Sequence, residues 1–499
     1  MDKRKSVLNV SVSIGFKILT MIMVIIVKRF LINVCGNDVN GLNALYLSII
    51  GFLSVAELGV GSAITFCMYK PIVEKDNNTV AALYHLFRRV YLVIGGIIFV
   101  SGIVIIPFLG FFAKDYEQVD ANLGFTFFLM LVSIIITYLF ACKSSLINAY
   151  KNNYITTAIS SSCLLLQYVL QIIVLIVTQS FVWYLVCRIV AALVQWIVTD
   201  VVTRQKYSTI LSNKNKELDA PVKRNLIKNI KAMFMHRVGY IFVNTVDSVV
   251  ISTFVGVIAL GMYSNYIMIL TSLTEVLKLV FTSLISVIGH FYIESDRSAT
   301  QKHCERFHLL NFILGCIFFL GYYASIDNLI EILFLKELIV SKSISLVITL
   351  NGFIQFMRQS TLAFREATGT FYNDRWKPLL EGSVNIVLSI IFVQWIGVTG
   401  VIAATIITNL LICHIIEPYV LYKNAFEVSP KKYYLKNYIR IFLFTGALVV
   451  LEYCKQSYAD VWTEFFVNGF ISVAISIVLC LIVVLFNWDS VKGLIKRAE

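Results

Sequence analysis

We single out nine of the charged residues that lie inside long apolar stretches of this sequence, where ionised side chains are rare. They are Lys17, Glu57, Lys143, Arg188, Arg237, Asp247, Glu275, Lys278 and Arg358. If these stretches span a membrane, each charge near a helix centre costs about 2.5–3.5 kcal/mol, so it is expected to face a cavity or another charge. Six are basic and three are acidic, and this excess predicts a cavity suited to an anion.

These residues are assigned candidate roles by their charge. The expected anion ligands are Lys17, Arg188, Arg237, Lys278 and Arg358, and the residues expected to couple ions or balance charge are Glu57, Asp247 and Glu275. Simpler roles stay open at this stage. Lys17 and Lys143 can snorkel to the inner membrane face, and Glu275 and Lys278 can pair along one helix because they are three residues apart.

Motifs for catalysis, metal binding or nucleotide binding are missing from the sequence. The six histidines form no HExxH, and no P-loop or glycine-rich nucleotide fingerprint occurs. The run HCERFH at 303–308 has no partner cluster, so we interpret it as polar filling of a cytoplasmic loop. The ten cysteines include no CxxC pair and are interpreted as small core residues. We therefore expect a protein that is not an enzyme, with no cofactor, no metal and no nucleic-acid partner.

The elements that position these charges are predicted to be transmembrane helices. The chain is 58% hydrophobic and 14% charged, with a mean hydropathy of +0.81, whereas soluble domains have about 25% charged residues. Its apolar stretches are long enough for helices of about 20 residues, and no alternating barrel strands are visible. Fourteen spans are predicted, at 10–33, 40–67, 89–112, 121–149, 155–178, 181–203, 232–255, 259–290, 308–327, 340–366, 378–396, 399–424, 439–455 and 464–487.

The distribution of Lys and Arg predicts the orientation of these spans. With the N-terminus inside, only Lys114, Lys336 and Lys455 fall in outside loops, so both termini are expected to be cytoplasmic in a multi-pass protein of the cell membrane. The longest connection, 204–231, is then cytoplasmic and basic. We interpret it as a solvated linker near anionic headgroups.

The second half of the sequence repeats part of the first at a shift of 220 residues. Under this shift Lys17 matches Arg237, Gly36 matches Gly256, Gly41 matches Gly261 and Tyr46 matches Tyr266. Six spans per repeat give both halves the same orientation, related by a pseudo-twofold axis along the membrane normal. The predicted domains are an N-lobe at 1–203, the linker at 204–231, a C-lobe at 232–425, and two extra spans with a cytoplasmic tail at 426–499.

The stretch LNALYLSIIGFLSVAELGVGSAITFCMYKP, together with two six-span halves and two extra spans, resembles the Wzx-type polysaccharide flippases. These belong to the multidrug/oligosaccharidyl-lipid/polysaccharide exporter superfamily. The resemblance is most specific over about 36–75, in the AELG-x-G and YKP phrases. It implies two helical bundles around a central cavity that works by alternating access, and a last helix pair that forms a groove for a lipid tail.

The resemblance also implies a substrate and its ligands. The substrate would be an undecaprenyl-pyrophosphate-linked oligosaccharide destined for capsule, O-antigen or exopolysaccharide, and Lys17 and Arg237 would bind its pyrophosphate. The implied partners are this lipid-linked oligosaccharide, membrane lipids, and a polysaccharide polymerase and glycosyltransferases of the same pathway, with the chain itself a monomer. Two alternatives stay open: a cation-coupled exporter of small molecules in the same superfamily, and a membrane polysaccharide polymerase.

Overall fold

The computed structural model describes residues 3–57, 60–119, 121–212, 223–224, 227 and 245–486. Within these ranges every regular element is helical, and ten helices are long and apolar enough to cross a membrane. Arg237, one of the predicted anion ligands, lies outside the described residues. The chain forms two compact units, which meet in sequence between Gly261 and Met262. It is an all-α polytopic membrane protein, as the sequence predicted.

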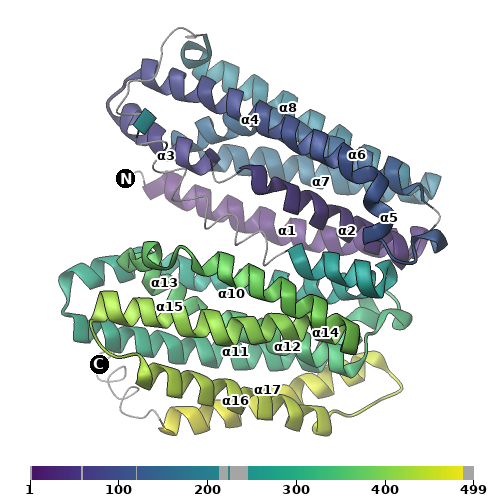
Figure 1. The fold of residues 1–499 in the computed structure, drawn as a ribbon, viewed down its shortest axis with the longest axis vertical. Helices are drawn as coiled ribbons and strands as arrows, with labels where there is room; N and C mark the ends of the chain where they lie inside the picture. The colour runs from purple at the N-terminus through teal and green to yellow at the C-terminus, as the bar shows by residue number, and fades with distance from the viewer. Residues whose placement is uncertain are drawn as a thin grey trace. The chain divides into compact units, whose positions relative to one another are not determined.

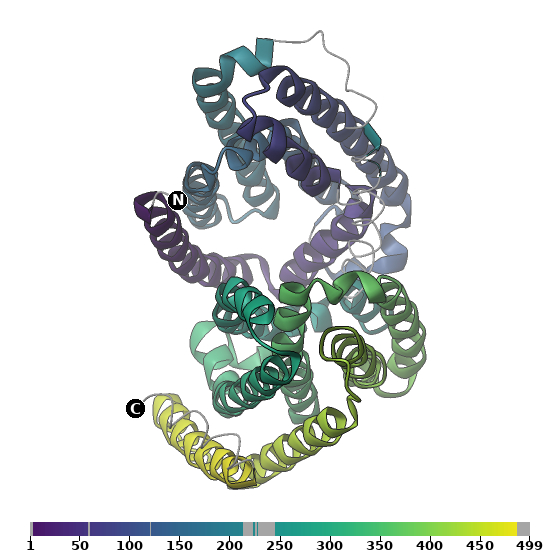
Figure 2. The same ribbon diagram turned by 90° about the vertical axis from the view of Figure 1, so that its left-hand side faces the viewer.

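The first unit is built from antiparallel helices joined by short connections (Figures 1 and 2). Its helices are α1 (Lys3–Cys35), α2 (Asn37–Leu53), α3 (Val60–Val73), α4 (Asn77–Ile105), α5 (Leu109–Phe112), α6 (Leu123–Ala149), α7 (Asn153–Thr178) and α8 (Phe181–Ser212). Helix α1 packs on α7, α7 on α8, α8 on α6, and α6 on α4. The predicted span 40–67 is broken by a 3-10 turn at Ser54–Glu57, which separates α2 from α3.

The second unit contains the later helices and begins within α10. Its helices are α10 (Val257–Glu294), α11 (Arg297–Leu333), α12 (Lys342–Met357), α13 (Gln359–Thr368), α14 (Lys377–Thr408), α15 (His414–Leu421), α16 (Lys431–Cys454) and α17 (Val461–Phe486). Two π-helical segments, Asn409–Cys413 and Tyr422–Phe426, flank α15. The predicted span 340–366 is divided at Arg358, where α12 ends and α13 begins.

Helix α14 is a hairpin of two helical arms. Ile396 and Gly397 leave helical geometry, and Gly397 has a φ of +57°, which glycine adopts without steric cost. Asn385 on the first arm donates a 2.8 Å hydrogen bond to the hydroxyl of Thr405 on the second. In a straight helix these residues would lie about 30 Å apart. The arms correspond to the predicted spans 378–396 and 399–424, which explains part of the difference between fourteen predicted spans and ten long apolar helices.

The predicted repeat has a structural counterpart inside the first unit. Gly36 and Gly256 both have positive φ, +93° and +136°, immediately before α2 and α10. A Cβ on Gly41 would overlap the carbonyl oxygen of Val257, and a Cβ on Gly261 would overlap that of Asn37. Val257 and Gly261 are the 220-residue counterparts of Asn37 and Gly41. The same contact is therefore made twice, once from each half of the repeat, in the register that the sequence predicted.

Helices α16 and α17 pack on the second unit through α11, at its edge in Figure 2. A polar stripe on α17 is buried, with Asn468, Ser472 and Ser476 each 1% exposed, and Ser476 donates a 3.3 Å hydrogen bond to the carbonyl of Cys316 on α11. Small side chains allow this close approach of two helices. The opposite face of α17 is apolar and exposed, as expected for a surface in contact with lipid.

Candidate substrate site and buried charge network

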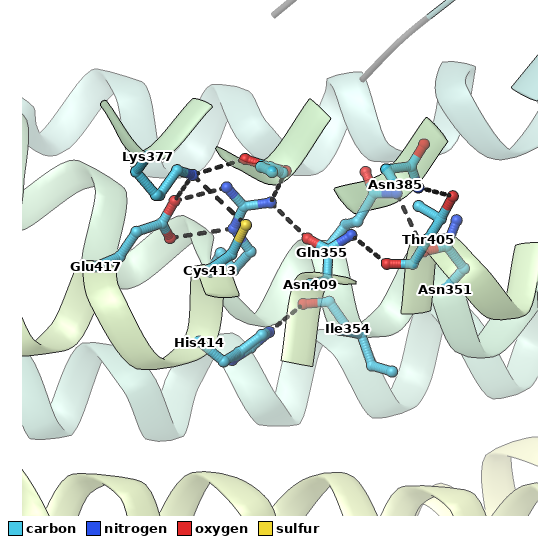
Figure 3. Close-up of polar contacts among 12 residues, drawn as sticks. Asn351, Ile354, Gln355, Lys377, Asn385, Thr405, Asn409, Cys413, His414 and Glu417 are labelled. Carbon is cyan, nitrogen blue, oxygen red and sulfur yellow. Dashed lines mark hydrogen bonds and ion pairs between the residues drawn. The ribbon is translucent and has the colours of Figure 1, made fainter. Parts of the chain in front are cut away.

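A buried network of charged residues lies in the second unit around Arg358. The guanidinium of Arg358 donates to both carboxylate oxygens of Glu417, with N–O distances of 2.6 and 3.1 Å. Another of its nitrogens lies 2.6 Å from the side-chain oxygen of Asn409 (Figure 3). Such a bidentate pair is among the strongest polar contacts in proteins, and it fixes the orientation of both side chains.

The network is completed by Lys377, by Glu381 and by the ion pair of Arg365 with Asp374. The ammonium of Lys377 lies 2.6 Å from Glu417 and 2.9 Å from Glu381 (Figure 3 labels Lys377 and Glu417). Arg365 pairs with Asp374 and also lies 3.6 Å from Glu417. The six members are Arg358, Arg365, Lys377, Asp374, Glu381 and Glu417, three basic and three acidic. All six side chains are at most 14% exposed, so the network is buried and formally neutral.

Separate helices bring this network together. Arg358 lies where α12 gives way to α13, Lys377 and Glu381 lie one turn apart at the start of α14, and Glu417 lies on α15 between two π-helical segments. Breaking a buried ion pair by removing one partner costs about 3–5 kcal/mol, because an uncompensated charge remains. The network therefore holds the ends of these helices together.

Arg358 was a predicted anion ligand, and the structure places it in this neutral network. Its donors are used by Glu417 and Asn409. Glu381 and Glu417 were not predicted as site residues, although both lie inside predicted spans. The available signal was the four-residue spacing of Lys377 and Glu381, which favours an ion pair along a helix.

Lys278 and Glu275 lie on one face of α10 and form an ion pair at 3.6 Å, as their spacing allowed. Both side chains are substantially exposed, 42% and 50%, so the pair is a surface feature of the described structure. Exposed pairs of this kind contribute little to stability, about 0–1 kcal/mol. Lys143 similarly pairs with Asp200, which also accepts from Arg204 at 2.8 Å.

Two predicted anion ligands remain in the described part of the first unit. Arg188 lies on α8 with its side chain half-buried, and the hydroxyl groups of Tyr168 and Tyr184 interact electrostatically with it. Within the described ranges no carboxylate forms an ion pair with Arg188. Lys17 lies on α1 and is exposed. Both residues stay predicted anion ligands.

Two acidic candidates, Glu57 and Asp247, lie in the first unit. Glu57 lies in the 3-10 turn after α2 and accepts a hydrogen bond from the hydroxyl of Tyr91 on α4. A Cβ at Gly61 would overlap that same hydroxyl, which gives a physical reason for the second glycine of the AELG-x-G phrase. Asp247 is 9% exposed and lies in the helical segment 245–250.

The histidine run at 303–308 does not lie in a loop, which corrects the sequence interpretation. It is part of α11, which begins at Arg297, and the Nδ1 of His308 lies 3.2 Å from the hydroxyl of Ser360. No group of three or more His, Cys, Asp or Glu side chains able to hold a metal ion is found among the described residues.

Comparison with solved structures identifies the fold. The lipid II flippase MurJ, in an inward closed conformation, superposes with a TM-score of 0.65 at 15% identity, covering 97% of this chain and 100% of that one. An inward-facing multidrug resistance transporter of the MATE family, MOP superfamily, gives 0.57 at 12% identity and covers 87% of this chain and 98% of that one. The chain has the fold of MOP-superfamily transporters. No family model matches the sequence, and no curated protein matches it.

Both matches extend over most of this chain and nearly all of the neighbour. Its ten long apolar helices, counted in the described ranges, are those of a multi-pass membrane protein, and its fold is one that these transporters share.

Proposed function

We propose that this chain is a flippase that moves an undecaprenyl-pyrophosphate-linked oligosaccharide from the inner to the outer leaflet by alternating access, for capsule, O-antigen or exopolysaccharide synthesis. The observation that carries the proposal is the match to the lipid II flippase over 97% of this chain and the whole of that one. A lipid-linked substrate needs a surface for its tail. The exposed apolar face of α17, with Phe470, Val473 and Ile477, has the required character.

The cationic residues are suited to binding an anionic headgroup. Lys17 and Arg188 lie in the first unit, and Arg237 is the 220-residue counterpart of Lys17. Cations compensate the hydration that a pyrophosphate loses on leaving water. We assign binding to these three residues, and to Lys278 once its pair with Glu275 opens. Arg358 has a supporting role, because it is held by Glu417.

The membrane potential provides a driving force without ATP. An inside-negative potential favours outward movement of an anion by about 2.3 kcal/mol per charge per 100 mV. A doubly charged pyrophosphate crossing the whole field as a free ion would gain about 4–5 kcal/mol. Bound cations that move with it reduce this gain. Glu57, Asp247 and Glu275 are the residues that would balance charge or couple an ion.

The second candidate is a cation-coupled exporter of small molecules, which the likeness to the multidrug transporter favours. Such an exporter would bind cationic drugs through acidic residues, so its transport rate would depend on the acidic candidates and not on the basic ones.

The proposed flippase would work within a pathway. Glycosyltransferases would supply its substrate, and a polysaccharide polymerase would consume its product. The chain would act as a monomer in the cytoplasmic membrane, with both termini inside.

The test is export in a flippase-deficient strain, combined with outward movement of a polyprenyl-pyrophosphate oligosaccharide in proteoliposomes. Arg188→Met and Arg237→Ala are expected to lower the rate at least about tenfold, because each removes a charge that would contact the headgroup. Arg237→Lys should keep part of the activity. Lys342→Met removes an exposed cation paired with Glu452 and is the matched control. The proposal fails if the wild-type protein moves cationic drugs but not the lipid, or if all variants match it.

A further inference from the structure

Helix α16 carries a buried arginine that forms no ion pair with a carboxylate among the described residues. Arg440 is only 4% exposed and lies on the face of α16 that packs on α11. Arginine is almost never this buried unless it is paired. The nearby Glu305 is already occupied, accepting from Lys436 at 2.8 Å and from Gln301 at 3.2 Å. Across the described residues, Arg440 forms no ion pair and no hydrogen bond.

The contacts that Arg440 does make are weak compensation for a buried charge. Its guanidinium carbon lies 5.9 Å from the centre of the Phe312 ring, at the outer limit of a cation–π contact. His308, Tyr422 and Tyr433, all neutral groups, are close enough to interact electrostatically with its charge. The carboxylate of Glu305 also acts on it, but its charge is matched by that of Lys436. The surroundings of Arg440 therefore have a net positive charge.

Several polar atoms around Arg440 are buried and also have no hydrogen-bond partner in the described structure. They are the hydroxyl of Tyr422, Nε2 of His308, and the side-chain oxygens of Asn311 and Asn437, and of these His308 and Asn437 also interact with each other. The other end of three of these side chains is held in place, that of His308 by Ser360 at 3.2 Å. Asn311 donates to the carbonyls of Phe356 and Met357, both at 3.0 Å, and Asn437 contacts Nδ1 of His414 at 3.0 Å. Such unsatisfied atoms mark a site for water or an ion.

Around Arg440, hydrogen-bond donors outnumber acceptors. Arg440 offers up to five N–H groups and Tyr422 one O–H, and the Nε2 of His308 is a donor when Ser360 donates to Nδ1. The acceptors are the two asparagine oxygens and the hydroxyl oxygen of Tyr422. Water could satisfy the hydrogen bonds, but it would leave the charge of Arg440 uncompensated in a medium of low dielectric constant.

We propose that a small monovalent anion of the size of chloride binds between α11 and α16, held by the guanidinium of Arg440 and the hydroxyl of Tyr422. Water fills the space toward the oxygens of Asn311 and Asn437. The anion neutralises a buried charge at the joint between α16 and the rest of the second unit. It therefore fixes the last helix pair on that unit, which is a role separate from transport of substrate.

The experiment measures thermal unfolding of the full chain, purified in nanodiscs, as the anion is varied at constant sodium concentration and ionic strength. Chloride and bromide are titrated against gluconate, a much larger anion. Halide binding to the folded protein should raise the unfolding midpoint saturably, by at least about 2 °C. Arg440→Met should remove this dependence. Tyr422→Phe should weaken halide binding, so that the concentration needed for half-saturation rises about threefold or more.

Lys342→Met, which removes an exposed cation elsewhere in the same unit, is the control and should keep the full halide effect. If Arg440→Met cannot be purified, Tyr422→Phe and equilibrium binding of chloride-36, with one ion expected per wild-type chain, decide the question. The proposal is overturned if chloride and gluconate give the same midpoint in the wild-type protein. It is also overturned if the variants respond to chloride as the wild type does, because the unsatisfied atoms then bind water only.

Discussion

Replacing Glu417 by glutamine would test whether the buried charge network holds the second unit together. Glu417 accepts from Arg358 and Lys377 and lies 3.6 Å from Arg365, so the change removes the acid that three cations share. Glutamine keeps the shape but not the charge. We expect a loss of about 3–5 kcal/mol in the free energy of unfolding, the cost of leaving a buried charge without its partner.

The assay is thermal unfolding in nanodiscs. At about 2–4 °C per kcal/mol for a unit of this size, the midpoint should fall by about 6–20 °C. Adding Lys377→Met to Glu417→Gln restores a neutral network and should recover part of the loss. Glu427→Gln is the matched control, because Glu427 pairs with Arg297 at an exposed site where about 0–1 kcal/mol is expected. A midpoint for Glu417→Gln no lower than that of Glu427→Gln would refute the reasoning.

Two further changes test the contacts of the first unit by the same measurement. Gly41→Ala should destabilise the protein, because the added Cβ overlaps the carbonyl oxygen of Val257, whereas Gly96→Ala, in open space within α4, should be neutral or stabilising by up to about 1 kcal/mol. If both variants have the same midpoint, the close packing is not present in the membrane. Tyr91→Phe should cost about 1.5–3 kcal/mol by removing the charge-assisted hydrogen bond to Glu57, and an unchanged midpoint would show that this bond is not formed.

The sequence determined the helical class, the number of spans and the register of the repeat. Hydropathy decides whether a segment can enter a membrane, and this property is local to the segment, so each predicted span that falls on described residues coincides with a helix or a pair of helices. The register rested on glycines, since Gly36 and Gly256 occupy positive φ and Gly41 and Gly261 lie at close backbone contacts. These constraints act within a few residues and are visible in the sequence.

The partners of the charges were decided only by the tertiary structure. A charge in an apolar stretch shows that a partner or cavity is needed, but the partner can come from any helix that packs alongside. Arg358 meets Glu417, 59 residues later, and Lys377 meets the same carboxylate from another helix. Arg440 lies at the edge of a predicted span, and only the packing of α16 on α11 buries it with no ion pair among the described residues. Side-chain pairing depends on the rotation and contacts of several helices at once, which no local pattern in the sequence encodes.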